Sequence, residues 1–147
     1  MKSKKVDTNK LIARLILNTK RVKRQDSIVQ VADDIAALQD KLGSLKRVSE
    51  TIGISTHMLN QFLGVNKLSP KVYELVKKRE LDSVSAVYYL GKHPSSDQIK
   101  LANSYINGEI NSQDIRVLGP LRSRYPNKSI EELIERTKQS KDIKVSV

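Results

Sequence analysis

Apolar residues spaced three or four positions apart recur in short stretches along the whole chain, and this spacing constrains the fold more than any other feature. Between residues 28 and 42, for example, Ile28, Val31, Ile35 and Leu38 share this spacing and would lie on one face of an α-helix. No stretch shows the convincing alternation of apolar and polar residues that a half-buried strand has. We therefore predict an all-α fold, in the form of a compact multi-helix domain.

The predicted helices are short and are separated by only a few residues. Thr8, Asp26 or Ser27, and Ser69 are expected caps, because such side chains accept hydrogen bonds from the first backbone N–H groups of a helix. Pro120 and Pro126 are expected to break the chain between the last two helices, because proline lacks the N–H that a helix interior needs. The helical stretches are residues 8–24, 27–42, 68–81, 82–92, 95–108, 111–119 and 129–139, with two further short helices between residues 45 and 65.

Positive charge is concentrated in two parts of the chain. The 147 residues carry a formal net charge of +11, which implies a polyanionic partner, either nucleic acid or an acidic membrane surface. Residues 1–24 contribute +8 and residues 41–79 contribute +6, whereas residues 25–40 contribute −4 and residues 80–147 only +1. For the first block two interpretations stay open: a solvated or flexible basic arm, and a surface that binds phosphates.

Several kinds of protein are excluded by what the sequence lacks. No apolar run approaches the roughly 20 residues of a membrane-spanning helix, and the start has no signal-peptide pattern. Cysteine is absent, which fits a reducing cytoplasm. His57 and His93 stand far apart without a second ligand at metal spacing, so both are expected at the surface. Because no metal site, phosphate loop or catalytic constellation is visible, we expect neither an enzyme nor a bound cofactor.

The stretch from residue 45 to residue 65 has the pattern of a helix-turn-helix. Gly53 supplies the turn, where a backbone with positive φ is needed, and Ser49 is small where the two helices would cross. Ile54 follows as the buried turn residue. The faces that would pack together carry Leu45, Val48 and Ile52 in the first helix and Leu59 and Phe62 in the second.

The outer face of the second helix carries side chains that can bind DNA. Asn and Gln can pair bidentately with adenine, while Ser, Thr and His donate and accept hydrogen bonds more loosely. The residues assigned to base readout are Ser55, Thr56, His57, Asn60 and Gln61. Phosphate contacts position a protein on the duplex. The basic residues assigned to them are Lys46, Arg47, Lys67 and Lys71.

Other interpretations of these residues stay open. Ser55 is also the natural N-cap of its helix, and amphipathic helix pairs with a glycine turn occur in bundles that bind no DNA. The five tyrosines could stack on single-stranded nucleic acid. Tyr88 and Tyr89, however, would point about 100° apart on a helix. At most one of them can face such a surface while the other enters the core.

Downstream of the helix pair, recognisable residues follow in a set order. The chain reads Leu68-Ser69-Pro70-Lys71-Val72, then Leu81-Asp82-Ser83 with Ala86, then Gln98 with Leu101, Ala102 and Gly108. This order resembles the central DNA-binding domain of ParB-type partition proteins. In that family a helix-turn-helix is followed by a Leu-x-Pro-x-Val helix start, an acidic-serine link into an Ala-containing helix, and a Gln-led helix that ends in a Gly turn.

The resemblance implies a division of the chain into three parts. Residues 44–118 would form the ParB-like helix-turn-helix DNA-binding domain. Residues 1–43 would form a basic helix and an acidic helix that pack on the core. Residues 119–147 would form a C-terminal helix and tail. Nothing like the family's N-terminal nucleotide-binding domain is visible before Leu45, so we do not expect nucleotide binding or clamp sliding.

The function that the resemblance implies is sequence-specific binding of double-stranded DNA, in plasmid or chromosome segregation or in transcriptional regulation. The expected partners are double-stranded DNA, a second copy of the chain in a homodimer, and a partition NTPase, with no membrane involved. The expected location is the cytoplasm, on the nucleoid or a plasmid. Two rival functions stay open: a nonspecific nucleic-acid coating protein driven by residues 1–24, and a helical protein-interaction module without DNA binding.

Overall fold

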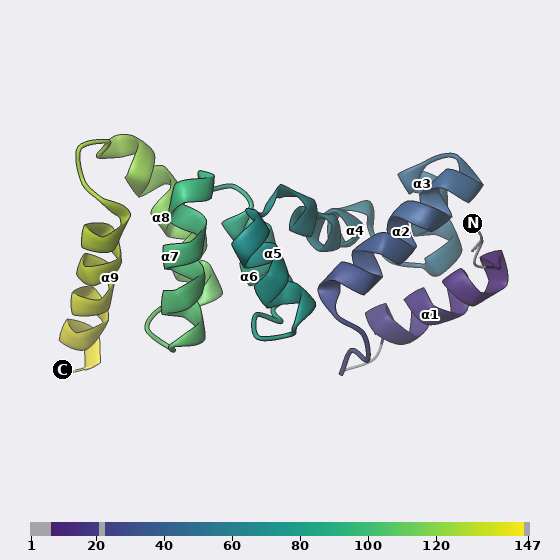
Figure 1. Cartoon of the computed structure of the whole chain (residues 1–147), viewed down its shortest axis with the longest axis horizontal. Helices are drawn as coiled ribbons and strands as arrows, with labels where there is room; N and C mark the ends of the chain where they lie inside the picture. Colours follow the sequence, from purple (N-terminus) through teal and green to yellow (C-terminus); the bar gives the residue numbers. More distant parts are fainter. Residues whose placement is uncertain (1–6, 21–22, 146–147) are drawn as a thin grey trace.

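The computed structural model of the chain describes residues 7–20 and 23–145, which form helices joined by short turns (Figure 1). Because these residues contain no strand, the predicted all-α fold is confirmed. The elements in chain order are α1 (Thr8–Lys20), α2 (Ile28–Leu42), α3 (Leu45–Ile52), α4 (Thr56–Leu63), the 3₁₀ helix η1 (Gly64–Lys67), α5 (Pro70–Lys77), α6 (Val84–Leu90), α7 (Ser95–Ile106), α8 (Ser112–Arg124) and α9 (Ile130–Val145).

Helices α1, α2 and α3 gather at one end of the long axis, α4, α5 and α6 lie in the middle, and α9 lies at the other end beyond α7 and α8 (Figure 1). In the N-terminal half, α2 packs against α1, α3, α4 and α5. Contacts of α4 with α6 and of α5 with α7 join this half to the rest, where α8 packs against both α6 and α9. Helix α4 therefore packs between α2 and α6 and connects the two halves of the molecule.

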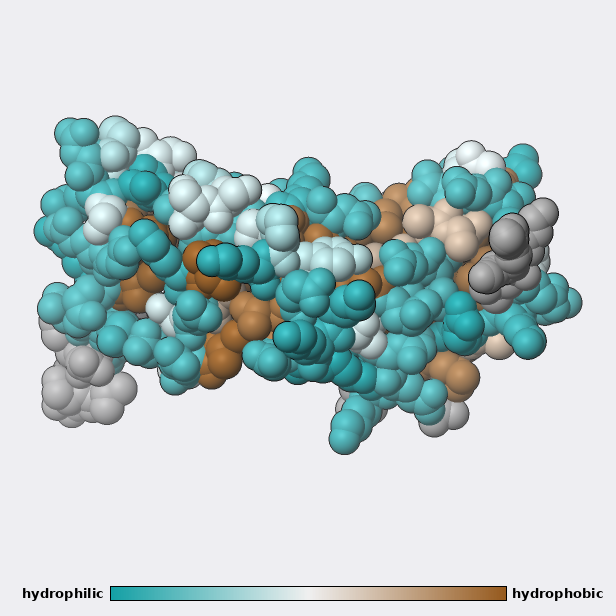
Figure 2. All heavy atoms as spheres, in the orientation of Figure 1, coloured by the Kyte–Doolittle hydropathy of each residue, from teal (hydrophilic) through white to brown (hydrophobic). Residues whose placement is uncertain are grey.

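One continuous core runs through the molecule and takes side chains from every α-helix. Leucine, isoleucine and valine make up most of it. The face drawn in Figure 2 is mainly hydrophilic, with hydrophobic residues showing in patches between the hydrophilic ones. No helix in the described part of the chain is both long and apolar enough to cross a membrane.

Serine side chains cap several helices and so fix where they start. Ser27 accepts a hydrogen bond from the backbone N–H of Gln30 at the start of α2, as expected. Ser69 precedes α5, with Pro70 in the first position, but it makes no side-chain capping bond. The expected cap Thr8 lies inside α1, and the first helical bond goes instead to the carbonyl of Asp7.

An ion pair holds α1 on α2. Arg14 donates hydrogen bonds of 3.1 Å and 2.7 Å to the two carboxylate oxygens of Asp34, which is 2% exposed. The bond to Asp34 raises the pKa of Arg14, so the guanidinium stays charged. The helix was expected to reach residue 24, but it ends at Lys20, and residues 21–22 lie outside the described residues.

The prediction that Pro120 breaks the chain is wrong, because α8 runs through it. Proline removes only one helical hydrogen bond, the one to the carbonyl four residues earlier. Leu118 and Leu121 flank Pro120 and both pack on the core. Burial of these neighbours holds the helix together across the proline.

The prediction that His93 lies at the surface is also wrong. The residue is 6% exposed, and its Nε2 lies 2.9 Å from the carbonyl oxygen of Ile115. A carbonyl only accepts, so the ring donates this bond. The contact joins the turn after α6 to α8 and satisfies a buried polar group.

Candidate nucleic-acid interface

The turn between α3 and α4 is closed by hydrogen bonds on both sides of Gly53. Gly53 has φ 85°, and its N–H donates to the carbonyl of Ser49 at 2.8 Å. Such a left-handed backbone favours glycine. The hydroxyl of Ser49 donates to the carbonyl of Ile54 at 2.5 Å, so Ser49 does more than leave room for the helix crossing. These bonds fix the direction in which α4 leaves the turn.

The two faces of α4 differ as the sequence predicts. Leu59 is fully buried and Phe62 is 4% exposed, so the inner face packs into the core. On the outer face, Ser55 caps the helix by accepting from the N–H of Met58 at 3.1 Å. The remaining residues assigned to base readout are exposed or half-buried: Thr56, His57 and Asn60 are exposed, and Gln61 is half-buried. No described part of the chain buries this outer face. Its use as the recognition helix of a DNA-binding helix-turn-helix stays a prediction.

Two of the predicted readout residues lie next to each other, and one of them meets an aromatic ring of α6. The Nε2 atoms of Gln61 and His57 lie 3.4 Å apart. The ring of His57 meets the ring of Tyr88 edge-on, with centroids 6.1 Å apart. Tyr89, by contrast, packs against the core. Both tyrosines are half-buried, their ring centroids lie 5.5 Å apart, and both line one further pocket, so the prediction that only one of them faces a surface is not confirmed.

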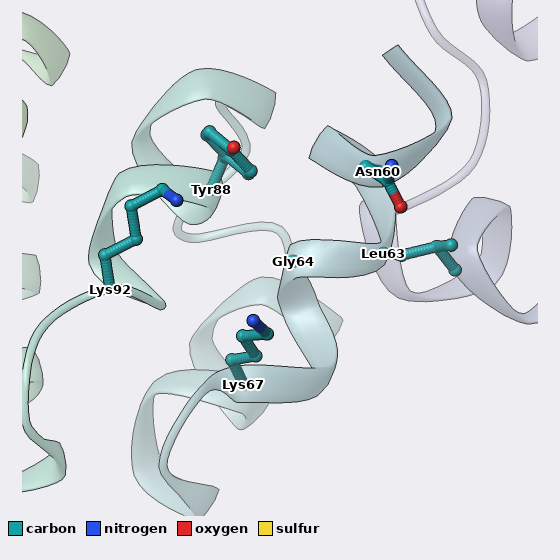
Figure 3. A pocket seen from close by; sticks show the side chains of 6 residues that line it. All are labelled: Asn60, Leu63, Gly64, Lys67, Tyr88 and Lys92. Atoms are coloured by element: carbon teal, nitrogen blue, oxygen red, sulfur yellow. The ribbon is translucent and has the colours of Figure 1, made fainter. Parts of the chain in front are cut away.

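A small pocket continues this surface at the C-terminal end of α4 (Figure 3). Its volume is about 240 Å³. Its lining residues are Asn60, Leu63, Gly64, Lys67, Tyr88 and Lys92. The ammonium of Lys92 lies 4.6 Å from the centroid of the Tyr88 ring, which is within the range of a cation–π interaction. The pocket thus joins one predicted readout residue and one predicted phosphate-binding residue to two residues of the α6 region.

A buried glutamine holds the two lysine-bearing segments of this pocket together. Gln98 is 1% exposed, and its Oε1 accepts from the N–H of Ser69 at 2.7 Å. Its Nε2 donates to the carbonyl of Lys67 at 3.1 Å and to that of His93 at 3.0 Å. One side chain of α7 therefore ties the end of η1 to the turn that follows Lys92.

The four residues assigned to phosphate binding are all exposed. Lys46 and Arg47 lie in the first turn of α3, and Lys71 lies in the first turn of α5. None of these four side chains forms an ion pair with a residue that the structure describes. Of the four, only Lys67 lines the pocket.

Three residues outside the set assigned to base readout and phosphate binding lie near the helix pair. Tyr88 and Lys92 come from the α6 region, as described. Lys20 comes from α1, and its Nζ lies 2.7 Å from the place that a Cβ atom of residue 53 would occupy. One basic residue of the N-terminal block therefore lies against the turn before α4. Neither helical spacing nor charge density signals such a position, because it depends on how separate helices pack.

The arrangement can form hydrogen bonds and bind anions. Its outer face combines amide, hydroxyl and imidazole groups with several ammonium and guanidinium groups. Among the described residues, no three His, Asp or Glu side chains lie together as a metal site would require.

Comparisons of the chain with protein-family models, with curated proteins and with solved structures found no match.

Proposed function

We propose that this chain is a non-enzymatic, sequence-specific double-stranded DNA-binding protein that places α4 in the major groove. The observation that carries the proposal is the outer face of α4, which holds five hydrogen-bonding residues and adjoins Lys67 and Lys92. Neither lysine forms an ion pair with a residue of the described chain. A helix with such a face matches the geometry in which a recognition helix reads base edges while its surroundings contact phosphates.

The proposed roles follow from the side-chain chemistry. Asn60 is exposed at the rim of the pocket, where its amide can form a bidentate pair with adenine. Gln61 is half-buried and lies next to His57, and this contact orients its amide for the same task. Ser55 and Thr56, at the start of α4, make looser contacts. Lys46, Arg47, Lys67 and Lys71 bind phosphates.

The biological setting is proposed from the resemblance to ParB-type partition proteins. The protein would act in plasmid or chromosome segregation or in transcriptional regulation, in the cytoplasm and on the nucleoid or a plasmid. A homodimer would double the few base pairs that one helix can read. A partition NTPase would be a further partner in segregation.

Selection of bound duplexes from a random pool tests this function. We expect a palindromic consensus, since a two-fold symmetric dimer reads two half-sites. Recovery of an unenriched pool would instead favour a nonspecific nucleic-acid coating protein. Failure to bind any duplex at low salt would favour a helical protein-interaction module.

Substitution of Asn60 tests the assigned readout. We expect Asn60→Ala to cost about 1–3 kcal/mol of binding free energy at a single base position and to relax the preference there. Repeating the selection with the variant and measuring its affinity for single-base variants of the site checks this. The matched control is Asn103→Ala, which alters an exposed asparagine of α7 and should leave the consensus unchanged. A uniform loss on all sequences would contradict base readout by Asn60.

A further inference from the structure

The pocket at the end of α4 has the chemistry of an anion site. Two of its six lining residues are lysines, none is acidic, and the others include the amide of Asn60 and the ring of Tyr88. Figure 3 shows the side chain of Lys67 extending toward Gly64 and that of Lys92 extending toward the ring of Tyr88. Two like charges held near one small space repel each other, and an anion between them would remove that cost.

We propose that this pocket holds one phosphodiester group of the DNA backbone, with Lys67 and Lys92 as its phosphate ligands and Tyr88 as a positioning residue for Lys92. The proposal rests on the function proposed above and extends the contact surface from the helix pair to α6. It assigns a phosphate contact to Lys92, which lies outside the helix pair.

Two glycines let the backbone segments come close enough to form the pocket. A Cβ atom at residue 64 would lie 3.2 Å from the Cα of Tyr88. A Cβ atom at residue 91 would lie 3.2 Å from the carbonyl oxygen of Gly64 and from the Cβ of Lys67. Both distances are tighter than ordinary contact. Glycine at these positions therefore brings Lys92 next to Lys67.

Tyr88 holds Lys92 in place and connects it to the readout face. Its ring receives the Lys92 ammonium at 4.6 Å and meets the His57 ring edge-on. A lysine held over an aromatic face loses less side-chain entropy when it binds a phosphate, because part of that entropy is already lost. Tyr88 therefore acts through Lys92.

The position of the pocket favours a backbone phosphate over a free one. Asn60 both lines the pocket and belongs to the outer face of α4. A helix in the major groove is flanked by a phosphate strand on each wall of the groove. A group immediately beside the end of such a helix therefore meets one of these strands.

The first test compares Lys92→Gln with the wild type on a short duplex of the selected sequence, with binding followed by fluorescence anisotropy at several salt concentrations. Loss of one phosphate contact should weaken binding about eightfold at 0.1 M salt and reduce the salt slope by about one. The control Lys100→Gln removes the same charge from α7, where Lys100 pairs with Glu131, and should bind as the wild type does.

A scan of the duplex with single methylphosphonate linkages, which are neutral, locates the phosphate. One linkage should weaken wild-type binding, and it should weaken binding by Lys92→Gln less, because only Lys67 then contacts that phosphate. Tyr88→Phe should bind as the wild type does. Tyr88→Leu should lose part of the affinity that Lys92→Gln loses, because Lys92 keeps its charge, and the double variant should lose no more than Lys92→Gln. Additive losses would overturn the positioning role of Tyr88, because a merely structural role gives independent effects.

The remaining outcomes separate the two proposals. Duplex binding by the wild type with unchanged affinity and slope in Lys92→Gln would overturn the phosphate site alone. Absence of wild-type duplex binding at low salt would overturn both proposals. Titration with inorganic phosphate, followed by NMR of the lysine side chains, distinguishes the source of the phosphate. Binding of free phosphate that the duplex does not displace would overturn the assignment to DNA.

Discussion

Residues 45–92 and residues 95–141 each contain eight lysine or arginine side chains, but they use them differently. In the C-terminal segment, residues 95–141, six of the eight form ion pairs: Lys100, Arg122, Lys128, Arg136, Lys138 and Lys141. In the central segment, residues 45–92, only Arg79 forms one with a residue that the structure describes, through Asp82. Density of basic residues alone would not separate the two segments.

The difference shows which positive charges remain available to a partner. A carboxylate within 4 Å of a lysine cancels most of the electric field that the lysine exerts on more distant groups. The paired cations of the C-terminal segment therefore interact mainly with this chain's own carboxylates. In the central segment, Lys67 and Lys92 form no ion pair with a described residue, and both line the pocket at the end of α4. Because exposed charges lose their mutual effect beyond a Debye length of about 10 Å at 0.1 M salt, only cations close to a bound polyanion strengthen binding. The three predictions that follow test this contrast.

The largest effect is expected from removing two unpaired charges of the central segment. We expect Lys46→Gln/Arg47→Gln to weaken duplex binding about 60-fold at 0.1 M salt and to reduce the salt slope by about two, because two phosphate contacts are lost. Anisotropy titrations across salt concentrations measure both quantities. The control Lys100→Gln/Lys138→Gln removes two paired cations of the C-terminal segment and should change the affinity less than about twofold. Equal losses of affinity in the two double variants would show that paired and unpaired cations contribute alike to DNA binding.

A stability effect without a binding effect is expected from the C-terminal segment. Arg122 donates to the buried carboxylate of Asp97 at 2.9 Å, and Arg122→Met leaves that carboxylate unpaired. We expect the free energy of unfolding to fall by about 2 kcal/mol, less than the about 3–5 kcal/mol for a fully buried pair, because the Arg122 side chain is 29% exposed.

Urea unfolding followed by circular dichroism measures this change. The control Arg136→Met breaks a more exposed pair with Glu132 and should cost less than about 1 kcal/mol. Duplex affinity of the folded Arg122→Met protein should match the wild type. A selective loss of affinity would show that this paired residue also serves binding.

The smallest effect concerns the acid dependence of stability. The hydrogen bond from Lys100 lowers the pKa of Glu131 below its usual value of 4.5. A lowered folded-state pKa means that the contribution to stability is present above 4.5 and is lost as the pH falls through the lowered value. The stability difference between the wild type and Lys100→Gln should therefore shrink as the pH falls below 4.5.

Urea midpoints at several pH values follow this change. The control Lys67→Gln should differ from the wild type by the same amount at every pH, because Lys67 has no carboxylate partner in the described chain. An acid-dependent difference in that control would mean that Lys67 pairs with a carboxylate in solution.

The sequence determined the all-helical fold and the division of α4 into two faces. Helical periodicity relates residues three or four positions apart, and these contacts lie within one helix. The inner residues Leu59 and Phe62 and the turn at Gly53 follow from such local spacing, and so does the cap at Ser55. The exposed outer face, including His57 and Asn60, was predictable for the same reason.

Only the tertiary structure decided which polar groups share a surface. Tyr88 lies 31 positions after His57, and the bond between Ser69 and Gln98 spans 29, so no local pattern relates these residues. The burial of His93 and the continuity of α8 through Pro120 likewise depend on neighbouring helices. Packing sets such contacts because close approach of backbone segments, here at Gly64 and Gly91, brings together side chains that the chain separates.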